Sequence, residues 1–387
     1  MMNIVFIEPF RHQLLPLTYT KPVSEIRCGI LKMKEKWEKR LPEADFSNLT
    51  ENYLKTLWPS QIEKDNIFVN ASVFPTPKLI DHITKLKSNQ ALFSDDVVVA
   101  YRSDAPEKYN EVLKFKDKLK FLKWLWDIFA FNHEAITDDF KLITQNRVSE
   151  PIPEHILAIN PNQIFIEKGA KLINGTLNAL DGPIYIGKDT EVMESVNIRG
   201  PFALCENAVV KMGAKIYTGT TIRLFSKVGG EVSNSVIQGF SNKGHDGFLG
   251  NSVIGEWCNL GADTNTSNLK NNYASVKLWN YNQEKFVDTG LQFCGLIMGD
   301  HSKCGINTMF NTGTVVGVSA NIFGEGFPRN FIPSFSWGGK NGFITYKFEK
   351  ALEVAEIVMK RRNKKLNDYD VDILKSVFEI SQQYRQH

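Results

Sequence analysis

Aliphatic residues recur at every sixth position through the middle of this chain of 387 residues. The longest unbroken series runs from Ile186 to Val228, and the spacing resumes over Phe248–Leu260 and Met298–Ile322. A helix repeats about every 3.6 residues and a half-buried strand about every 2, so neither produces this pattern. Six-residue units, each a short strand and a turn, stack into a parallel β-helix of hexapeptide repeats. A β-sandwich is the alternative, but its strands recur at roughly 8–12 residues.

The flanks of this repeat divide the chain into three expected regions. Residues 1–150 alternate apolar strands such as Asn3–Ile7 and Ile67–Ala71 with helical patterns, which predicts an α/β domain. A proline-rich connector then leads into a β-helix domain over residues 151–342. Residues 343–387 have helical patterning and are expected to dock on the open end of the β-helix or on a neighbouring subunit. The helices expected in the first domain are Ile30–Arg40, Pro77–Lys87 and Pro106–Phe129.

Composition limits the class of protein further. A hydrophobic fraction of 42% with 23% charged residues is typical of a globular protein. The net charge of +3 is spread along the chain, which argues against a nucleic-acid partner. No apolar run approaches the roughly 18 residues that span a bilayer, so a cytoplasmic protein without a membrane partner is expected. The five cysteines have no CxxC spacing, so we expect neither a disulfide framework nor a metal site formed by them.

A partial nucleotide-binding motif follows the first expected strand. Residues Leu15–Thr18 and Lys21-Pro22 match the Pro-Leu-Thr…Lys-Pro stretch of sugar-phosphate nucleotidyltransferases, and residues 1–150 resemble a short, divergent branch of that family. The family has a glycine-rich loop where Pro9-Phe10-Arg11-His12-Gln13 stands here, and a proline offers no N–H to a phosphate. The resemblance implies Lys21, and more weakly Arg27 and Arg11, as phosphate-binding residues.

The metal-binding position of the same family also differs. Ala71-Ser72 stand where the family has Gly-Asp, and a serine is a poor replacement for the carboxylate that holds Mg²⁺. The resemblance therefore implies a degenerate domain that still binds a sugar nucleotide, with Mg²⁺ needed only if the domain is active. The alternative is an active Mg²⁺-dependent sugar-1-phosphate nucleotidyltransferase. It requires a carboxylate such as Asp95, Asp96 or Asp104 near Lys21.

A second resemblance lies in the hexapeptide region, over residues 243–272. This segment is similar in order and spacing to the acetyltransferase half of the bifunctional N-acetylglucosamine-1-phosphate uridyltransferase/glucosamine-1-phosphate acetyltransferase family. The resemblance implies a left-handed β-helix with His245 as the general base that takes the proton of an amine. It also implies Asn259 and Asn268 as residues that position the acceptor and the thioester. Further implied contacts are Lys270 for a phosphate, and Gly261, Ala262 and Gly305 for acetyl-CoA or another acyl-CoA.

Several positions depart from this second pattern. Phe248 and Leu269 replace tyrosines, and Ser233 replaces a lysine that meets the sugar phosphate in the family. Lys243, Lys270 and Lys277 are the candidate substitutes, and His301 is a rival base. In the homotrimer that the family implies, a loop over Thr264–Val287 is expected to cover the groove between neighbouring subunits.

Together these patterns predict a transferase that moves an acyl group from coenzyme A to a small molecule, a sugar phosphate or nucleotide sugar. Two alternatives stay open at this point. One is the active nucleotidyltransferase described above. The other is a non-catalytic trimeric protein that binds a sugar nucleotide.

Overall fold

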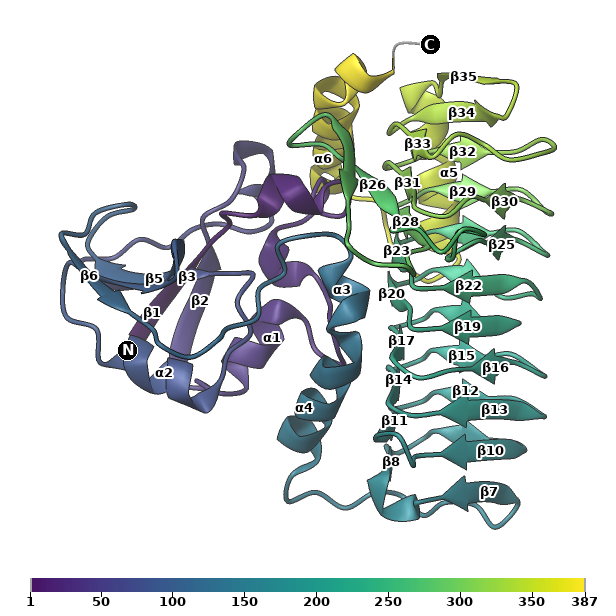
Figure 1. Ribbon diagram of the computed structural model, residues 1–387, viewed down its shortest axis with the longest axis horizontal. Helices are drawn as coiled ribbons and strands as arrows, with labels where there is room; N and C mark the ends of the chain where they lie inside the picture. Colours follow the sequence, from purple (N-terminus) through teal and green to yellow (C-terminus); the bar gives the residue numbers. More distant parts are fainter. Residues whose placement is uncertain (1, 386–387) are drawn as a thin grey trace.

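An N-terminal α/β domain stands beside a long parallel β-solenoid in the computed structural model, which describes residues 2–385 (Figure 1). Two C-terminal helices pack against both parts near the upper end of the solenoid. The architecture confirms the expected fold class, an α/β domain followed by a left-handed β-helix and C-terminal helices.

The N-terminal domain is built on one six-stranded sheet. Strand β1 pairs in parallel with β2 and β3, and β5 joins β3 in antiparallel fashion. The strands in spatial order are β2 (Ala44–Asn48), β1 (Met2–Ile7), β3 (Asn66–Asn70), β5 (Val97–Ser103), β4 (Gln90–Ser94) and β6 (Glu111–Lys114). The helices are α1 (Met33–Glu38), α2 (Pro77–Thr84), α3 (Asp127–Ala130) and α4 (Asn132–Thr144), with 3-10 turns η1 (Arg11–Leu14), η2 (Val23–Glu25) and η3 (Asn52–Leu54).

One expected helix is absent. The stretch Pro106–Phe129 contains strand β6, and only its last residues enter α3. Residues Glu111–Lys114 pair in parallel with β4, and all four are exposed at the edge of the sheet. The prediction was wrong because sheet pairing, which is not local in sequence, overrides the local spacing of lysines and apolar residues.

Each coil of the solenoid contributes strands to three parallel rows. The first row consists of β7 (Ile156–Ile159), β10 (Gly175–Asn178), β13 (Val196–Arg199), β16 (Lys215–Ile216), β19 (Glu231–Ser233) and β22 (Phe248–Gly250). Above it stand β25 (Asn265–Thr266) and β30 (Met309–Phe310). The 3-10 turn η4 (Pro161–Gln163) connects β7 to the next row.

The second row faces the N-terminal domain (Figure 1). Its strands are β8 (Ile164–Ile166), β11 (Ile184–Ile186), β14 (Phe202–Leu204), β17 (Thr220–Ile222), β20 (Val236–Gly239), β23 (Val253–Glu256), β28 (Leu296–Met298), β31 (Thr314–Val316) and β33 (Phe331–Ile332). The third row consists of β9 (Lys171–Leu172), β12 (Glu191–Val192), β15 (Val209–Val210), β18 (Lys227–Val228), β21 (Asn242–Lys243), β24 (Asn259–Leu260), β29 (Lys303–Cys304), β32 (Asn321–Ile322), β34 (Ser336–Gly339) and the antiparallel β35 (Gly342–Thr345).

The six-residue period arises from these three rows. Ile186 lies beside Leu204 and Leu204 beside Ile222, so these coils take 18 residues, or six for each row. The repeating aliphatic side chains are buried, with Ile186 and Ile222 at 0% exposure. Stacked coils therefore bury one another's aliphatic residues in a continuous core.

A hairpin that leaves the solenoid packs within the same chain. Strands β26 (Lys277–Asn280) and β27 (Lys285–Asp288) form it, and Tyr281 at its tip contacts Tyr19 of the N-terminal domain with ring centroids 5.6 Å apart. Tyr281 also lies 5.2 Å from Tyr384 in the C-terminal turn η5 (Gln382–Tyr384). Aromatic packing therefore holds the hairpin on its own N-terminal domain, and the expectation that Thr264–Val287 covers a groove between subunits stays a prediction.

The C-terminal helices are α5 (Phe348–Lys360) and α6 (Asp368–Ile380). Helix α5 lies along the solenoid, where Val354 and Val358 face its third row across a cavity. Helix α6 reaches the N-terminal domain at η3. No helix within residues 2–385 has the length and apolar character to cross a membrane.

Candidate functional site

A cavity of about 710 Å³ lies between the third row of the solenoid and helix α5. We call it the solenoid cavity. Four residues that the sequence singled out line it: His245, Asn259, Gly261 and Ala262. Phe240, Trp257, Val354 and Val358 add apolar surface to its wall. Residues of the solenoid and residues of helix α5, which lie far apart in the sequence, therefore line the same cavity.

His245 stands on the corner that connects β21 to β22, with its side chain exposed. The corner is held from inside the coil by Lys243, whose Nζ donates hydrogen bonds to the carbonyl oxygens of His245 at 2.7 Å and Asp246 at 3.1 Å. Burial lowers the pKa of Lys243 to about 8, although Asp246 and Asp263 oppose this shift. Lys243 therefore serves the backbone of the corner and is no substitute for the missing phosphate-binding lysine.

The two predicted asparagines lie apart. Asn259 is exposed on β24, beside Asn242 and Lys303 in the neighbouring coils, and faces the solenoid cavity. Asn268 follows strand β25, on the corner where the chain leaves the first row. Its Nδ2 donates a hydrogen bond to Asn251 Oδ1 at 2.9 Å. A strand of three residues spans about 10 Å, so the length of β22 separates this corner from that of His245. The structure therefore brings only Asn259 to His245 within one chain.

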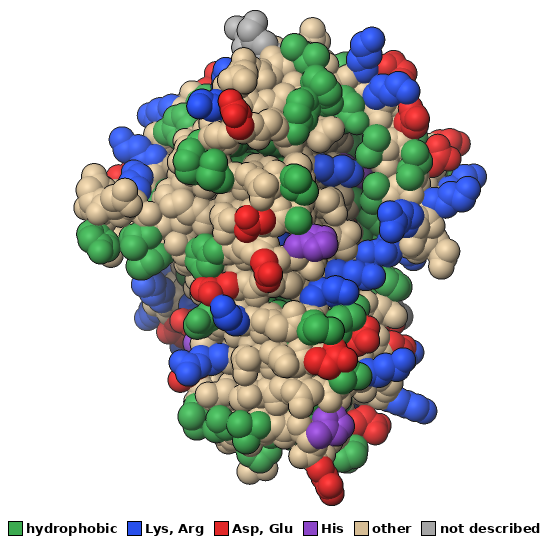
Figure 2. All heavy atoms as spheres, turned by 90° about the vertical axis from the view of Figure 1, so that its right-hand side faces the viewer, with side chains coloured by type: hydrophobic (Ala, Val, Ile, Leu, Met, Phe, Trp, Pro, Cys, Tyr) green, Lys and Arg blue, Asp and Glu red, His purple; other side chains and the backbone are tan. Residues whose placement is uncertain are grey.

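The solenoid cavity is strongly cationic. Five lysine and arginine side chains line it, and no aspartate or glutamate does. Figure 2 views the solenoid from the right of Figure 1 and shows Lys and Arg side chains gathered at mid-height on the right of this face. The cationic side chains of the cavity are Lys211, Lys227, Lys303, Arg361 and Arg362. An anionic ligand fits such a surface.

Sequence reasoning missed all five of these cations. Lys211 and Lys227 look like ordinary outward-facing residues of a hexapeptide repeat. Arg361 and Arg362 lie some 135 residues further along the chain, and only the return of α5 brings them to the solenoid. The adjacent arginines with Lys360, Lys364 and Lys365 were the one available signal.

Lys21 is no free phosphate ligand. Its Nζ lies 2.9 Å from Asp300 Oδ2 and 3.1 Å from Glu256 Oε2, both on the solenoid, and the residue is only 5% exposed. Burial alone would lower the pKa of Lys21, but the two carboxylates outweigh it and raise the pKa above its ordinary value. Lys21 thus acts as a buried interdomain tether, which corrects the expectation of phosphate binding.

Arg27 occupies the same interface. Its backbone N–H donates to Gln238 Oε1 at 2.9 Å, and its Nη2 lies 3.2 Å from Glu35 Oε2. It is 5% exposed, so it too serves domain docking. The prediction misassigned Lys21 and Arg27 because the sequence did not reveal that the solenoid covers this side of the domain.

The remaining predicted contacts lie outside the solenoid cavity or have a packing role. Lys270 donates from Nζ to the carbonyl oxygen of Ser275 at 2.7 Å and does not line the cavity. Gly305 does not line it either. Gly261 lines it, but a Cβ there would lie 2.4 Å from the backbone of Gly305, so coil stacking by itself requires a glycine.

His301 is a poor rival for the role of base. It lies on a corner of the solenoid, stacked near Trp257 with ring centroids 6.3 Å apart. Burial, together with Lys303 and Lys21, lowers the pKa of His301 to about 3. A base works best when its pKa lies near the working pH, so this imidazole accepts a proton poorly at neutral pH.

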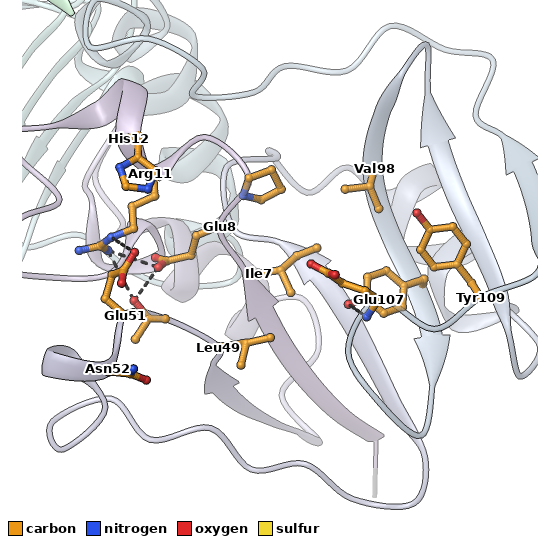
Figure 3. A pocket seen from close by; sticks show the side chains of 13 residues that line it. Ile7, Glu8, Arg11, His12, Leu49, Glu51, Asn52, Val98, Glu107 and Tyr109 are labelled. Atoms are coloured by element: carbon orange, nitrogen blue, oxygen red, sulfur yellow. Dashed lines mark hydrogen bonds and ion pairs between the residues drawn. The ribbon is translucent and has the colours of Figure 1, made fainter. Parts of the chain in front are cut away.

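The N-terminal domain has a second cavity of about 710 Å³ at the end of β1, shown in Figure 3. Arg11 lies at the position of the family's glycine loop, and residues of its own domain bind its guanidinium group. Its guanidinium lies 3.3 Å from Glu8 Oε2 and 3.1 Å from Tyr53 Oη and also donates to the carbonyl oxygen of Thr18. Glu8, Glu51 and Glu107 line this cavity, and Arg11 is its single Lys or Arg residue. The cavity therefore disfavours phosphate groups.

A metal site is not formed by the side chains of residues 2–385, where no group of three His, Cys, Asp or Glu is suitably placed. Ser72, at the position of the family's metal aspartate, is fully buried. Asp104 pairs with Lys108 at 2.8 Å, and the carboxylates beside Lys21 are Glu256 and Asp300 rather than Asp95, Asp96 or Asp104. The five cysteines are all buried and free.

Comparisons with known proteins find one matching family model and several similar transferases. Residues 3–148 match the model of a family described as sugar nucleotidyl transferase. The bifunctional protein GlmU of Methanococcus aeolicus is 32% identical over 137 residues, which cover 35% of this chain and 29% of that protein. A bifunctional sugar-1-phosphate nucleotidylyltransferase/acetyltransferase of Sulfurisphaera tokodaii is 31% identical over 165 residues, which cover 38% of this chain and 41% of the relative.

Solved structures of acyltransferases also align with the chain. The polySia-specific acetyltransferase NeuO aligns over 54% of this chain and 100% of its own, with 13% identity and a TM-score of 0.24. The UDP-N-acetylglucosamine acyltransferase of Francisella novicida aligns over 59% of this chain and 92% of its own, with 13% identity and a TM-score of 0.24. The chain spans less than half the length of the two curated relatives named above. The expected resemblance to a nucleotidyltransferase joined to a hexapeptide acyltransferase is confirmed, and the relatives are transferases.

Proposed function

We propose that the protein is an acyltransferase that moves an acyl group from coenzyme A to an amino group of a sugar phosphate or nucleotide sugar. The carrying observation is the solenoid cavity, where His245 and Asn259 share a wall with five cations and no carboxylate. Both substrates bring phosphate groups, and an apolar wall beside cations suits the pantetheine arm of an acyl-CoA. The chemistry of the cavity lining therefore supports binding of an acyl-CoA, in addition to the resemblance in sequence.

His245 would act as the general base. The acceptor nitrogen attacks the thioester carbonyl, His245 takes the proton that the nitrogen loses, and the thiolate of coenzyme A leaves and is then protonated. The amide of Asn259, which lines the cavity and has no other side-chain hydrogen bond among the described residues, would donate to the oxyanion of the tetrahedral intermediate. Lys243 holds the corner that carries the base.

The N-terminal domain, in this proposal, binds a sugar nucleotide weakly or not at all and catalyses no nucleotidyl transfer. Arg11, Lys21 and Arg27, the cations that the resemblance implied, all pair with carboxylates. Nucleotidyl transfer depends on clamped phosphates and a divalent metal. Incubation with Mg²⁺, a nucleoside triphosphate and a sugar 1-phosphate should therefore release no pyrophosphate.

We also propose that three chains associate in the cytoplasm. Large apolar side chains are exposed along the edge of the solenoid that carries His245, among them Met212 at 65% and Ile306 at 70%. Light scattering after size exclusion should give three times the chain mass of 43.9 kDa, and a monomer at micromolar concentration would contradict this part of the proposal.

The decisive test of the proposed function is acetyl transfer from acetyl-CoA, followed by thiol release, with amino-sugar phosphates as acceptors. His245→Gln should reduce kcat by about 10²–10⁴-fold, the usual contribution of a general base. His301→Gln is the matched control and should retain acetyl transfer. The acyltransferase proposal is contradicted if His245→Gln leaves the activity unchanged or if the wild type shows no saturable binding of acetyl-CoA. Either result would favour a sugar-nucleotide binding protein.

A further inference from the structure

Four cations of the solenoid cavity form a compact group at its lower end, which we call the cationic cluster. Lys211 and Lys227 come from neighbouring coils of the third row, and Arg361 and Arg362 come from the end of α5. Within residues 2–385, no carboxylate lies within ion-pair distance of any of the four. The cluster is thus an uncompensated concentration of positive charge.

These cations affect one another. Partial burial, followed by Arg362, Lys211 and Arg361, lowers the pKa of Lys227, and Glu191 opposes the shift only weakly. Burial and the neighbouring Arg361 also lower the pKa of Arg362. Like charges held together in this way repel one another, so the arrangement is at its most stable when an anion lies between them.

A purely structural role explains only half of the cluster. Arg361 and Arg362 stand at the carboxyl end of α5, where cations stabilise the helix dipole. Arg362 is further fixed by its Nη2, which donates to Asn242 Oδ1 at 3.1 Å. Lys211 and Lys227 belong to the solenoid, so they are not the cations that terminate the helix. An anion between the lysines and the arginines would offset the repulsion among the four charges.

We propose that the cationic cluster binds the phosphate group of a phosphorylated small molecule whose reacting end lies at His245. The identity of that reacting end rests on the proposed function, but the binding of phosphate does not. Two sources can present a phosphate here, the acceptor sugar or the acyl-CoA donor. The spacing favours the acceptor.

The spacing follows from the strand register. Lys227 lies directly beside Asn242 in the next coil, and the corner of His245 begins two residues after that strand starts. Adjacent strands are about 4.8 Å apart, so Lys227 lies one coil and Lys211 two coils, about 10 Å, below the level of His245. A hexose holds its 1-phosphate and 2-amino groups within such a distance, whereas the long pantetheine arm would carry a thioester well beyond it. The acceptor phosphate is therefore assigned to the cluster, and the donor to the upper part of the cavity near Lys303 and Ile306.

The test is titration calorimetry of the full chain with four probes: glucosamine 1-phosphate, glucosamine, coenzyme A and dephospho-coenzyme A. The variant is the double substitution Lys211→Met and Lys227→Met, which keeps side-chain volume and removes two charges. Lys171→Met, an exposed lysine of the same row, is the control. Circular dichroism and light scattering establish that each variant is folded.

The wild type should bind glucosamine 1-phosphate saturably, and the affinity should fall at least tenfold in the double variant but not in the control. Glucosamine, which has no phosphate, should bind more weakly than glucosamine 1-phosphate to the wild type and to the control. Affinity for coenzyme A should change less than threefold. Equal affinity of wild type and double variant for every probe overturns the site. A loss confined to coenzyme A and spared with dephospho-coenzyme A overturns the acceptor assignment, because the 3′-phosphate of the donor then occupies the cluster.

These outcomes separate the site from the proposed function. Binding of glucosamine 1-phosphate that depends on Lys211 and Lys227 supports the cluster even if His245→Gln leaves acetyl transfer unchanged. Conversely, acetyl transfer that needs His245 but ignores the double variant overturns the cluster and leaves the acyltransferase standing.

Discussion

Lys243 reaches from the interior of the solenoid to the carbonyl oxygen of His245, with 2.7 Å between Nζ and the oxygen. Its position in β21 is an inward one, beside Val228 of the coil below, where the repeat calls for an aliphatic side chain. The residue is 3% exposed, and its ammonium donates hydrogen bonds to two backbone carbonyl groups. A buried charge thus fixes the corner that carries the candidate base.

Lys243→Met should change the pH dependence of stability and should also lower activity. Burial lowers the pKa of Lys243 to about 8, below its ordinary value, so the folded protein binds fewer protons than the unfolded chain between about pH 8 and 10.5. Stability of the wild type therefore rises with pH across that window, by up to about 3 kcal/mol relative to the variant. Urea unfolding of both proteins at pH 7, 8, 9 and 10 measures this difference.

The comparison is internally controlled, because Lys303, whose pKa burial also lowers to about 8, is present in both proteins. Acetyl transfer should fall at least tenfold in Lys243→Met at pH 7.5, since the His245 corner loses its internal donor, while Lys243→Arg should recover part of it. A difference in unfolding free energy that does not vary with pH would show that the lysine is not buried in its charged form.

Lys21→Met should loosen the joint between the domains. Asp300 has no other cation within ion-pair distance among residues 2–385, whereas Glu256 keeps Arg223 at 2.8 Å. A buried carboxylate left unpaired costs about 3–5 kcal/mol of folding stability. Chemical denaturation should show this loss, and the double variant Lys21→Met/Asp300→Asn should regain much of it.

Lys78→Met provides the comparison for that prediction, because Lys78 and Asp117 form an ion pair that is largely exposed. Such a surface pair contributes about 0–1 kcal/mol. If Lys21→Met is as mild as Lys78→Met, the interdomain tether is refuted.

Gly261→Ala and Gly305→Ala should behave differently. A Cβ on Gly261 would lie 2.4 Å from the backbone of Gly305, whereas a Cβ on Gly305 meets its nearest neighbour, Phe323, at 3.6 Å. Overpacking typically costs about 1–3 kcal/mol, so Gly261→Ala should lower the unfolding free energy by that amount. Gly305→Ala should stay within about 0.5 kcal/mol of wild type. Thermal and urea unfolding measure the two changes in unfolding free energy. Equal changes in the two variants would mean that coil stacking does not require a glycine at position 261.

Asn259→Ala and Asn268→Ala should divide activity from stability. Asn259 faces the solenoid cavity, and loss of one oxyanion donor typically costs about 10²–10³-fold in kcat. Asn268 instead donates to Asn251, and loss of that hydrogen bond costs about 1 kcal/mol of stability. If Asn268→Ala lowers kcat as strongly as Asn259→Ala in a folded protein, a second chain must bring Asn268 into the site.

Much of the fold was predictable from sequence because the hexapeptide repeat is a local pattern. Each coil repeats the same three rows, so the spacing of Ile186, Leu204 and Ile222 already specifies which residues stack. His245, Asn259, Gly261 and Ala262 lie on neighbouring coils, and their convergence on the solenoid cavity follows from the same register. Asn268 does not lie at the cavity, because it is on the corner at the other end of the first-row strands.

The sequence by itself therefore determined the solenoid, its buried aliphatic core and the corner that carries His245. Tertiary structure decided what docks on that solenoid. Lys21 became an interdomain tether because its partners Glu256 and Asp300 belong to a distant segment, and the cationic cluster exists because α5 returns Arg361 and Arg362 to Lys211 and Lys227. A repeat encodes contacts between neighbouring coils, but contacts between domains depend on individual side chains far apart in the chain, and no period records them.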